Sequence, residues 1–195
     1  MRRGCVARTI VSLLLSMAVV AMPALADIQT ESKRPPEPSI EQRLVGYTER
    51  LQMAYSLASV ASYSITPTDL RTHTQQLINL LEGHKGRHAT EMRPPFSEYI
   101  GLLEETSRMI VFFDTRPLPP EIRRAIHTSL ERVLAYLEAT LEAALDAQKQ
   151  RRLNAATDRM LRAYAYLATA LRGNPETPDC TGILYFPELL ERADM

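Results

Sequence analysis

Apolar side chains recur every three or four positions along five stretches of this 195-residue chain, and this spacing constrains the fold more than any other feature. A period near 3.6 residues gives a helix one apolar stripe, which must be buried because isolated helices of this length are marginal in water. The stretch from about Ile40 to Tyr63 shows the pattern most regularly. The chain has no Trp and only 7 Gly, which disfavours a sheet sandwich. We therefore expect an all-α protein.

Local signals predict where these helices begin and end. Ser39, with Gln42 three residues later, is typical of a capping box, and Pro67 after Thr66 is typical of a second helix start. Gly83 is the expected terminator of that second helix. The apolar stripe slips in phase over 146–152, where a turn or kink is predicted. The five predicted helices cover about 40–63, 67–82, 96–114, 120–145 and 153–172.

Helices of this length joined by short connections usually pack antiparallel. We therefore predict a single domain over 40–195, folded as an antiparallel bundle of four to five helices with a short irregular C-terminal tail. In that tail, the apolar run Ile183–Phe186 is expected to pack across the end of the bundle, and 187–193 has the length for two helical turns. No repeat is apparent along the sequence.

The first 26 residues have the organisation of a secretory signal peptide. Met1–Arg8 is basic, Ile10–Val20 is apolar, and Ala24-x-Ala26 is a typical cleavage site. The apolar segment is too short to span a bilayer, which needs about 20 residues. Cleavage after Ala26 would leave a flexible Pro-rich tether over 27–39 and no transmembrane segment. We therefore expect an exported protein, periplasmic or extracellular.

Cleavage would also change the charge and the cysteine content. The full chain balances 23 basic against 23 acidic side chains, but the signal segment holds three arginines and no acid, so the remainder has a net charge of −3. This balance argues against a nucleic-acid partner or an anionic membrane. Cys5 would leave with the signal, and Cys180 alone could form no internal disulfide. Cys180 is then either a packed thiol or a group for intermolecular or reactive chemistry.

The sequence contains no motif that assigns a reaction. It has no Glu-x-x-His pair for a di-iron centre, no C-x-x-C-H for c-type haem, no Ser-His-Asp elbow, no phosphate loop and no dinucleotide fingerprint. We therefore expect a non-enzymatic exported protein that binds a partner protein or a small ligand. A hydrolytic enzyme is a further alternative, without a motif to carry it.

The end of the second predicted helix and the loop after it are the best candidate for a binding site. Gly83–Pro95 is long for a connection within a bundle, and long ordered loops are often functional. It is also the most basic local stretch of the chain, and the preceding helix carries several amide side chains. The candidate binding residues are His73, Gln76, Asn79, His84 and His88.

The histidines support an alternative function, a metal- or haem-binding bundle. His84 and His88 are four residues apart, a spacing that on a helix places two rings on one face, although here it lies in a glycine-containing loop. Such a site would take a divalent transition metal, Zn²⁺ or Cu²⁺. A b-type haem would need an inward His together with Met160 or a second His. The structural alternative is that these rings are solvated or hydrogen-bonded. The candidate metal ligands are His73, His84, His88 and His127.

Two further patterns bear on architecture. The segment His73-x5-Asn79-x3-Gly83 resembles a pattern in secreted helical-bundle proteins of uncharacterised function, and this resemblance implies a helical bundle and no particular activity. The 8 Tyr are twice as frequent as the 4 Phe. Because Tyr can bury its ring while its hydroxyl stays hydrogen-bonded, these residues indicate either helix-interface packing or a Tyr-lined polar pocket.

Overall fold

Helices make up most of the described chain, which confirms the predicted all-α class. The computed structural model describes residues 39–90, 100–173 and 181–192. The predicted signal peptide, most of the tether, Phe96 and Cys180 lie outside these residues. No helix in the described ranges is long and apolar enough to cross a membrane. The elements are α1 (Ile40–Ser62), α2 (Pro67–Glu82), α3 (Leu102–Asp114), α4 (Pro120–Lys149), α5 (Leu153–Arg172), the 3₁₀ helix η3 (Ile183–Tyr185) and α6 (Phe186–Glu191).

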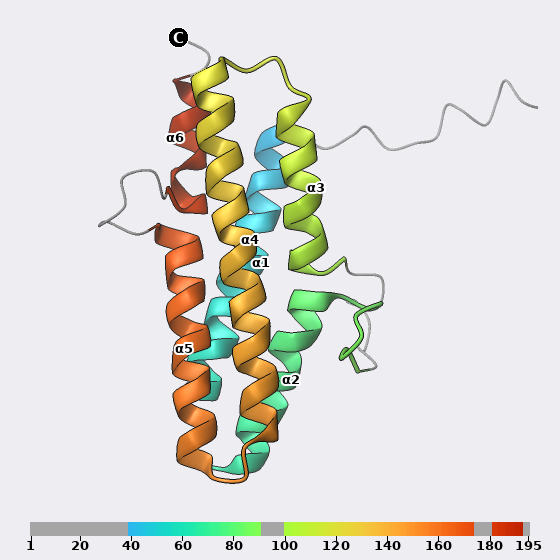
Figure 1. Cartoon of the computed structure of the whole chain (residues 1–195), viewed down its shortest axis with the longest axis vertical. Coiled ribbons are helices and arrows are strands. Elements are labelled where there is room, and N and C mark those ends of the chain that lie inside the picture. The colour runs from blue at the N-terminus through green and yellow to red at the C-terminus, as the bar shows by residue number, and fades with distance from the viewer. Residues whose placement is uncertain (1–38, 91–99, 174–180, 193–195) are drawn as a thin grey trace, which may run out of the picture. The chain divides into compact units, whose positions relative to one another are not determined.

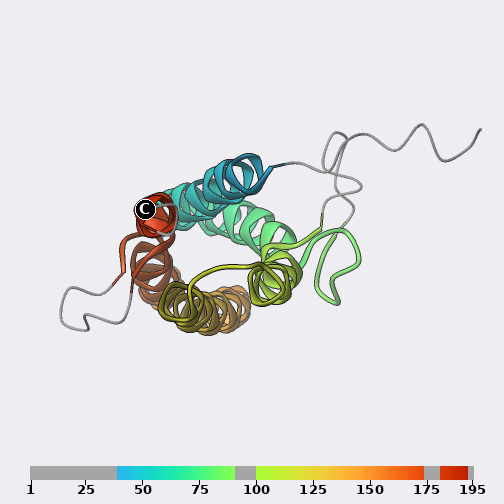
Figure 2. The ribbon, with the colours of Figure 1, turned by 90° about the horizontal axis from the view of Figure 1, so that it is seen from above.

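The helices form a bundle of four columns (Figures 1 and 2). The first column is α1, the second is α2 followed by α3, the third is the 30-residue α4, and the fourth is α5 followed by η3 and α6. Neighbouring columns run antiparallel, as predicted. The difference from the prediction is within the second column, where α2 and α3 run in the same direction, end to end (Figure 1).

The predicted helix ends are largely confirmed. Ser39 and Gln42 form both hydrogen bonds of a capping box, and the Thr66 side chain accepts from the N–H of Asp69 with Pro67 in the first turn. Gly83 ends α2 with φ 75°, in the region that favours glycine. These contacts lie within a few residues of one another, so the sequence pattern suffices to predict them.

Two predicted boundaries are wrong. The third helix begins at Leu102 and not near 96, because Ile100 pairs with Gly83 in an isolated β-bridge and Gly101 is the N-cap. The fourth helix extends beyond 145 to Lys149, so the turn predicted within 146–152 is present but covers only 150–152. Ala147 explains this extension, because its 1% exposure shows that the buried stripe continues past Ala144 while polar neighbours face water.

A tight helix-to-helix junction joins α2 to α3. After Gly83, the chain returns so that Ile100 bridges Gly83 and Gly101 packs on the end of α2. A β-carbon on Gly101 would lie 2.2 Å from the carbonyl carbon of Glu82, which leaves space only for glycine. The junction therefore depends on glycine at both of its ends.

The same junction joins α5 to η3 and α6. Gly173 ends α5 with φ 78° and bridges Thr181, and a β-carbon on Gly182 would lie 2.2 Å from the nitrogen of Gly173. Helix hairpin, junction and terminal helix thus occur twice, as α1–α2–α3 and as α4–α5–α6. The repeat is in the order of the backbone elements. The chain segments between Gly83 and Gly101 and between Gly173 and Gly182 differ in length, which explains why no repeat is apparent in the sequence.

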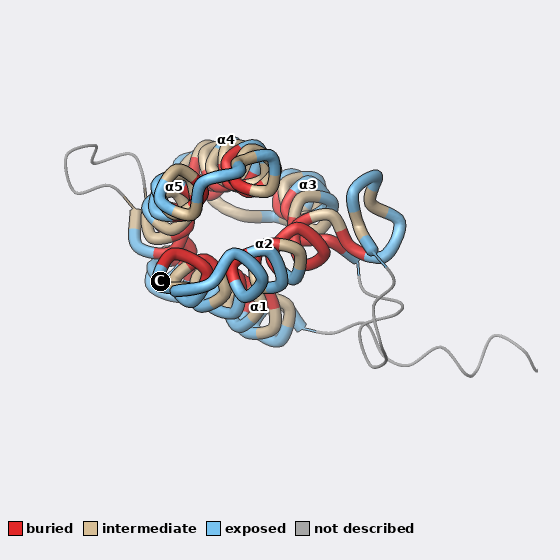
Figure 3. Tube along the Cα trace, turned by 90° about the horizontal axis from the view of Figure 1, so that it is seen from below, coloured by how far each residue is buried: buried red, intermediate tan, exposed pale blue. Residues whose placement is uncertain are grey.

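The core lies between the four columns, and buried residues line their inner sides (Figure 3). Its largest fully buried side chains include Tyr47, Phe113 and Phe186. The Tyr47 hydroxyl lies 2.6 Å from Oγ1 of Thr106 and joins α1 to α3 inside the core. Ile183 and Phe186 are 1% and 0% exposed, which confirms that the apolar run in the tail packs against the bundle.

Candidate functional site

The loop that follows α2 projects sideways from the junction between α2 and α3 (Figure 1). Its described part is Gly83–Thr90, and we call these residues the anchored loop. Only two backbone hydrogen bonds lie within it, from Gly86 to the carbonyl of Gly83 and from Ala89 to that of Gly86. Its remaining hydrogen bonds come mainly from side chains of the bundle, which therefore determine its conformation.

Asn79 holds the far end of the anchored loop. This side chain is only 7% exposed, and its Oδ1 accepts from the Thr90 N–H at 3.0 Å while its Nδ2 donates to the Thr90 hydroxyl at 3.3 Å. The amide thus satisfies a backbone donor that would otherwise lack a partner. Its position one turn before the end of α2 places it beside the returning loop.

Gln75 connects the anchored loop to a second helix. Its Nε2 donates both to Oδ1 of Asn79 and to the carbonyl oxygen of His88, each at 2.9 Å. Its Oε1 accepts from Nε2 of Gln148 on α4 at 2.7 Å. The loop is consequently tied to α2 and, through one amide, to α4.

Glu82 holds the middle of the loop. One carboxylate oxygen accepts from the His88 backbone N–H at 2.7 Å, and the other lies 2.7 Å from Nδ1 of the same residue. The Glu82 side chain is 9% exposed and that of His88 is 40% exposed. The carboxylate is therefore used to fix the loop, and it contributes little negative charge to the surface.

Basic side chains lie exposed on the anchored loop. His84, Lys85 and Arg87 are all exposed. Within the described parts of the chain, no hydrogen bond or ion pair engages Lys85 or Arg87. The side chains of Asn79, Gln75 and Glu82 on α2 therefore fix the loop, and the loop presents the cations of Lys85 and Arg87 to solvent.

The predicted binding residues take different parts in this arrangement. Asn79 and His88 belong to the network, and His84 lies on the exposed surface. His73 and Gln76 contact each other through Nδ1 and Oε1 at 3.3 Å and no bond joins either to the loop. The sequence pattern did not single out Glu82, Thr90 or Gln148, and it did not distinguish Gln75 from the other amides of the helix. The one available signal was the recurrence of Gln75, Asn79 and Glu82 at steps of four and three, which places them on one face of α2.

The four histidines lie on α2 (His73), in the anchored loop (His84 and His88) and on α4 (His127). His127 on α4 lies between two carboxylates, with Nδ1 2.9 Å from Asp114 and Nε2 3.2 Å from Glu131. The hydrogen bond to Asp114 raises the pKa of His127 above its usual value, against a smaller opposing effect of desolvation. Among the described residues, no group of three or more His, Cys, Asp or Glu side chains could hold a metal ion. The predicted site of His73, His84, His88 and His127 therefore gains no support from them.

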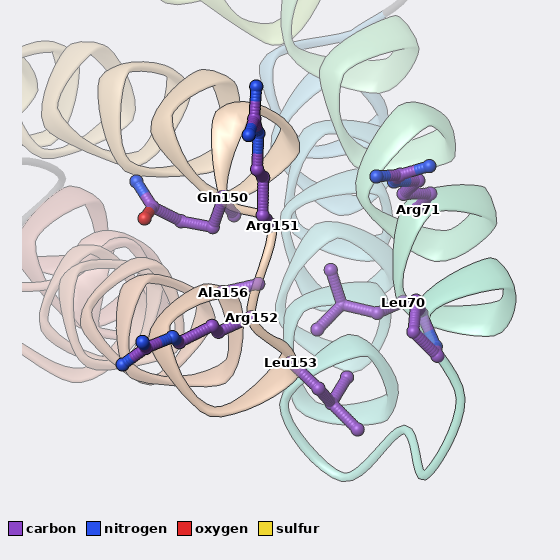
Figure 4. Close-up of a pocket in the computed structure, with 9 residues that line it drawn as sticks. Leu70, Arg71, Gln150, Arg151, Arg152, Leu153 and Ala156 are labelled. Carbon is purple, nitrogen blue, oxygen red and sulfur yellow. The ribbon is translucent and has the colours of Figure 1, made fainter.

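Two hollows elsewhere on the bundle offer weaker sites. A cavity of about 10 Å³ lies between the start of α2 and the α4–α5 turn, and Figure 4 shows Arg71, Arg151 and Arg152 extending from it in different directions. A surface hollow of about 160 Å³ lies between α4 and α5. Its lining balances acids on α4 against arginines on α5, and it selects neither anions nor cations. These charged residues are Glu142, Asp146, Arg159 and Arg162.

The His88–Glu82 pair has the form of an imidazole oriented by a carboxylate, as in catalytic dyads. In the described residues, however, no Ser, Thr or Cys side chain forms a hydrogen bond with His88. The same carboxylate also binds the His88 backbone N–H, so the pair acts on the loop's conformation. Among the described residues, the pair thus lacks the hydrogen-bonded nucleophile that such a dyad activates.

Fold and site together define an antiparallel helical bundle of two similar halves that carries one loop anchored by side chains. Comparisons of the chain with protein-family models, with curated proteins and with solved structures found no match. The functional argument therefore depends on the residues described above.

Proposed function

We propose that this chain is an exported, non-enzymatic binding protein, and that the anchored loop is its docking surface for a partner protein that presents carboxylate groups. The observation that carries the proposal is that different side chains anchor the loop and face the solvent. Half-buried or buried side chains of α2 fix its backbone, whereas Lys85 and Arg87 are left exposed without partners in the described chain.

Anchoring favours binding because ordering a loop costs free energy. A loop held in one conformation before contact avoids most of that cost when a partner docks. Asn79, Gln75 and Glu82 supply five hydrogen bonds that reach the loop from α2.

Charge complementarity selects the kind of partner. The Glu82 carboxylate is paired with His88 and mostly buried. The exposed charges of the loop are therefore those of Lys85 and Arg87, which are cationic. Carboxylate groups of a partner would complement Lys85 and Arg87, and such pairs increase association rates and specificity. The negative net charge predicted for the exported chain makes this a local feature and not a general affinity for polyanions.

The test uses a fluorescently labelled hexaglutamate peptide as the probe, with a hexaglutamine peptide as the neutral comparison. We expect salt-sensitive binding of the first peptide only, measured by fluorescence anisotropy. Lys85→Glu combined with Arg87→Glu should weaken binding by about tenfold or more, because the double change reverses both exposed charges of the anchored loop.

Arg151→Glu combined with Arg152→Glu is the matched control. It makes the same change of charge at the α4–α5 turn and should alter the affinity by less than about twofold. Equal losses in the two double variants would show a general charge effect and contradict the assignment of the loop. Absence of hexaglutamate binding to the unaltered protein would overturn the proposed partner chemistry.

Export is tested separately by N-terminal sequencing of the protein recovered from outside the cytoplasm. We expect the recovered chain to begin at Asp27. Ala24→Arg combined with Ala26→Arg should block cleavage, because the site needs small residues. Recovery of the full-length chain in the cytoplasm would contradict export without bearing on the loop.

The alternative functions have their own measurements. Elemental analysis and an absorption spectrum of the protein purified from its native host would detect a bound transition metal or haem. Metal-free and colourless protein would remove the histidine-based alternative. A hydrolytic function would require ester or peptide turnover that His88→Ala abolishes.

A further inference from the structure

Two tyrosines from opposite halves of the bundle meet face to face. The rings of Tyr55 on α1 and Tyr164 on α5 are stacked, with centroids 4.6 Å apart and an interplanar angle of 29°. Their hydroxyl groups are hydrogen-bonded to each other, and both side chains are half-buried. This contact combines ring stacking with a hydrogen bond between the two phenolic hydroxyls.

The surroundings of Tyr164 favour the phenol form of this side chain. The hydrogen bond from Tyr55 raises the pKa of Tyr164, and desolvation acts in the same direction. The Arg172 guanidinium lies 5.7 Å from the centroid of the Tyr55 ring. Both side chains retain partial contact with water, so protons released at the hydroxyls can reach the solvent.

We propose that Tyr55 and Tyr164 form an oxidative modification site, at which peroxide joins the two rings into an intramolecular dityrosine that fastens α1 to α5. The carbons beside the hydroxyls are the positions at which tyrosyl radicals couple. A hydroxyl–hydroxyl hydrogen bond between stacked rings brings those carbons together. The inference does not depend on the proposed binding function.

The reaction balances with hydrogen peroxide as the oxidant and a haem peroxidase as its activator. Each phenol loses one electron and its hydroxyl proton to give a phenoxyl radical. The radicals form one carbon–carbon bond, and the hydrogens on the coupled carbons move to the oxygens and restore both hydroxyls. Peroxide takes up the two electrons and two protons and becomes two molecules of water.

The cysteine content gives such a link a structural role. The sequence has two cysteines, and cleavage after Ala26 would leave Cys180 alone, so no internal disulfide could form. The tyrosines are 109 positions apart. A covalent bond that closes so large a loop restricts the unfolded chain, as disulfides do, and stabilises the folded bundle.

The chain contains a matched control pair. Tyr136 on α4 and Tyr166 on α5 are also stacked, with an interplanar angle of 24°, but their ring centroids are 6.4 Å apart. If stacking of half-buried tyrosines were sufficient, both pairs would couple. If close approach of the two rings is required, only the first pair would.

The experiment treats the folded exported chain with hydrogen peroxide and a catalytic amount of peroxidase. We expect dityrosine fluorescence, a mass lower by two hydrogens, and a cross-linked peptide pair containing Tyr55 and Tyr164. The oxidised protein should also show a higher midpoint of thermal unfolding. Tyr55→Phe and Tyr164→Phe should each abolish the intramolecular product, and Tyr136→Phe should leave it unchanged.

Each variant removes only a hydroxyl group, and circular dichroism checks that the helices are retained. The proposal is overturned if oxidation yields no intramolecular dityrosine in the unaltered protein. It is equally overturned if the product persists in Tyr55→Phe, or if the cross-link maps to Tyr136 and Tyr166.

Discussion

At the scale of single residues, the amide of Asn79 shows how one buried polar side chain fixes a loop. It lies buried and binds both the N–H and the hydroxyl of Thr90, so its own atoms are unavailable to a partner. Under the proposed function, its contribution to binding would be indirect, through the conformation of the loop. A polar residue near a predicted site therefore need not touch the ligand.

Replacement of Asn79 should loosen the loop and lower stability. Asn79→Ala leaves the Thr90 N–H without its partner, and we expect a loss of about 1–3 kcal/mol in the free energy of unfolding. Hydrogen exchange at Thr90 should also become faster. Gln76→Ala, an exposed change on the same helix, is the control and should stay within about 0.5 kcal/mol. Equal protection of Thr90 in both variants would contradict the anchoring role.

The imidazole of His127 should make a small, pH-dependent contribution to stability. Because its pKa is raised in the folded state, chiefly by the hydrogen bond to Asp114, the protonated ring favours folding. This contribution is present below the unfolded-state pKa of 6.5 and is lost as the pH rises through the folded-state pKa. The exposed carboxylates that face the ring are Asp114 and Glu131.

The comparison of the unaltered protein with His127→Gln measures this contribution. We expect the unaltered protein to be more stable by up to about 0.5 kcal/mol near pH 5.5, and equal to the variant near pH 8.5, since exposed pairs contribute little. Urea denaturation at the two pH values gives both differences. An advantage that grows at the higher pH would refute the assigned direction of the pKa change.

At the scale of elements, glycine decides where one helix gives way to the next. Gly83 and Gly173 end helices with positive φ, and Gly101 and Gly182 allow the following segment to pack against the helix end. Between the junctions, α4 runs without interruption beside both halves of the second column (Figure 1). α4 thus runs past both glycine junctions, the one between α2 and α3 and the one between α5 and η3.

Alanine should have opposite effects at two glycines. Gly101→Ala places a β-carbon 2.2 Å from the Glu82 backbone, and we expect a loss of about 2 kcal/mol or more, with disturbance of the anchored loop. Gly46→Ala, within α1, meets only the end of the Arg50 side chain at 3.4 Å and should stabilise by about 0.5–1 kcal/mol. Thermal unfolding of both variants tests the pair, and destabilisation of equal size would argue against the close approach.

At the scale of the whole molecule, contacts between aromatic side chains hold different columns of the bundle together. Phe186 at the start of α6 packs edge-on against Phe113 near the end of α3, with ring centroids 6.5 Å apart. Both rings are almost fully buried, so the C-terminal segment is part of the core. Because α6 has only six residues, tertiary packing and not helix propensity stabilises it.

Truncation of Phe186 should therefore lower the stability of the whole bundle. Phe186→Ala removes a large buried side chain, and we expect a loss of about 3–5 kcal/mol with a single cooperative transition. Leu184→Ala, at a side chain 44% exposed, is the matched control with an effect within about 0.5 kcal/mol. Calorimetry distinguishes the outcomes, and an unchanged midpoint in Phe186→Ala would show that α6 detaches independently.

Sequence alone determined the helical class, most helix ends and the burial of the tail, because each depends on a period of 3.6 residues or on contacts a few positions apart. It failed at the start of α3 and at the length of α4, where Gly83 pairs with Ile100 and where Ala147 finds neighbours distant in the chain. Only the tertiary structure decided which side chains hold the loop and which tyrosines meet. Gln75 with Gln148 and Tyr55 with Tyr164 are 73 and 109 positions apart. No local pattern encodes such pairings, because packing of whole helices brings them together.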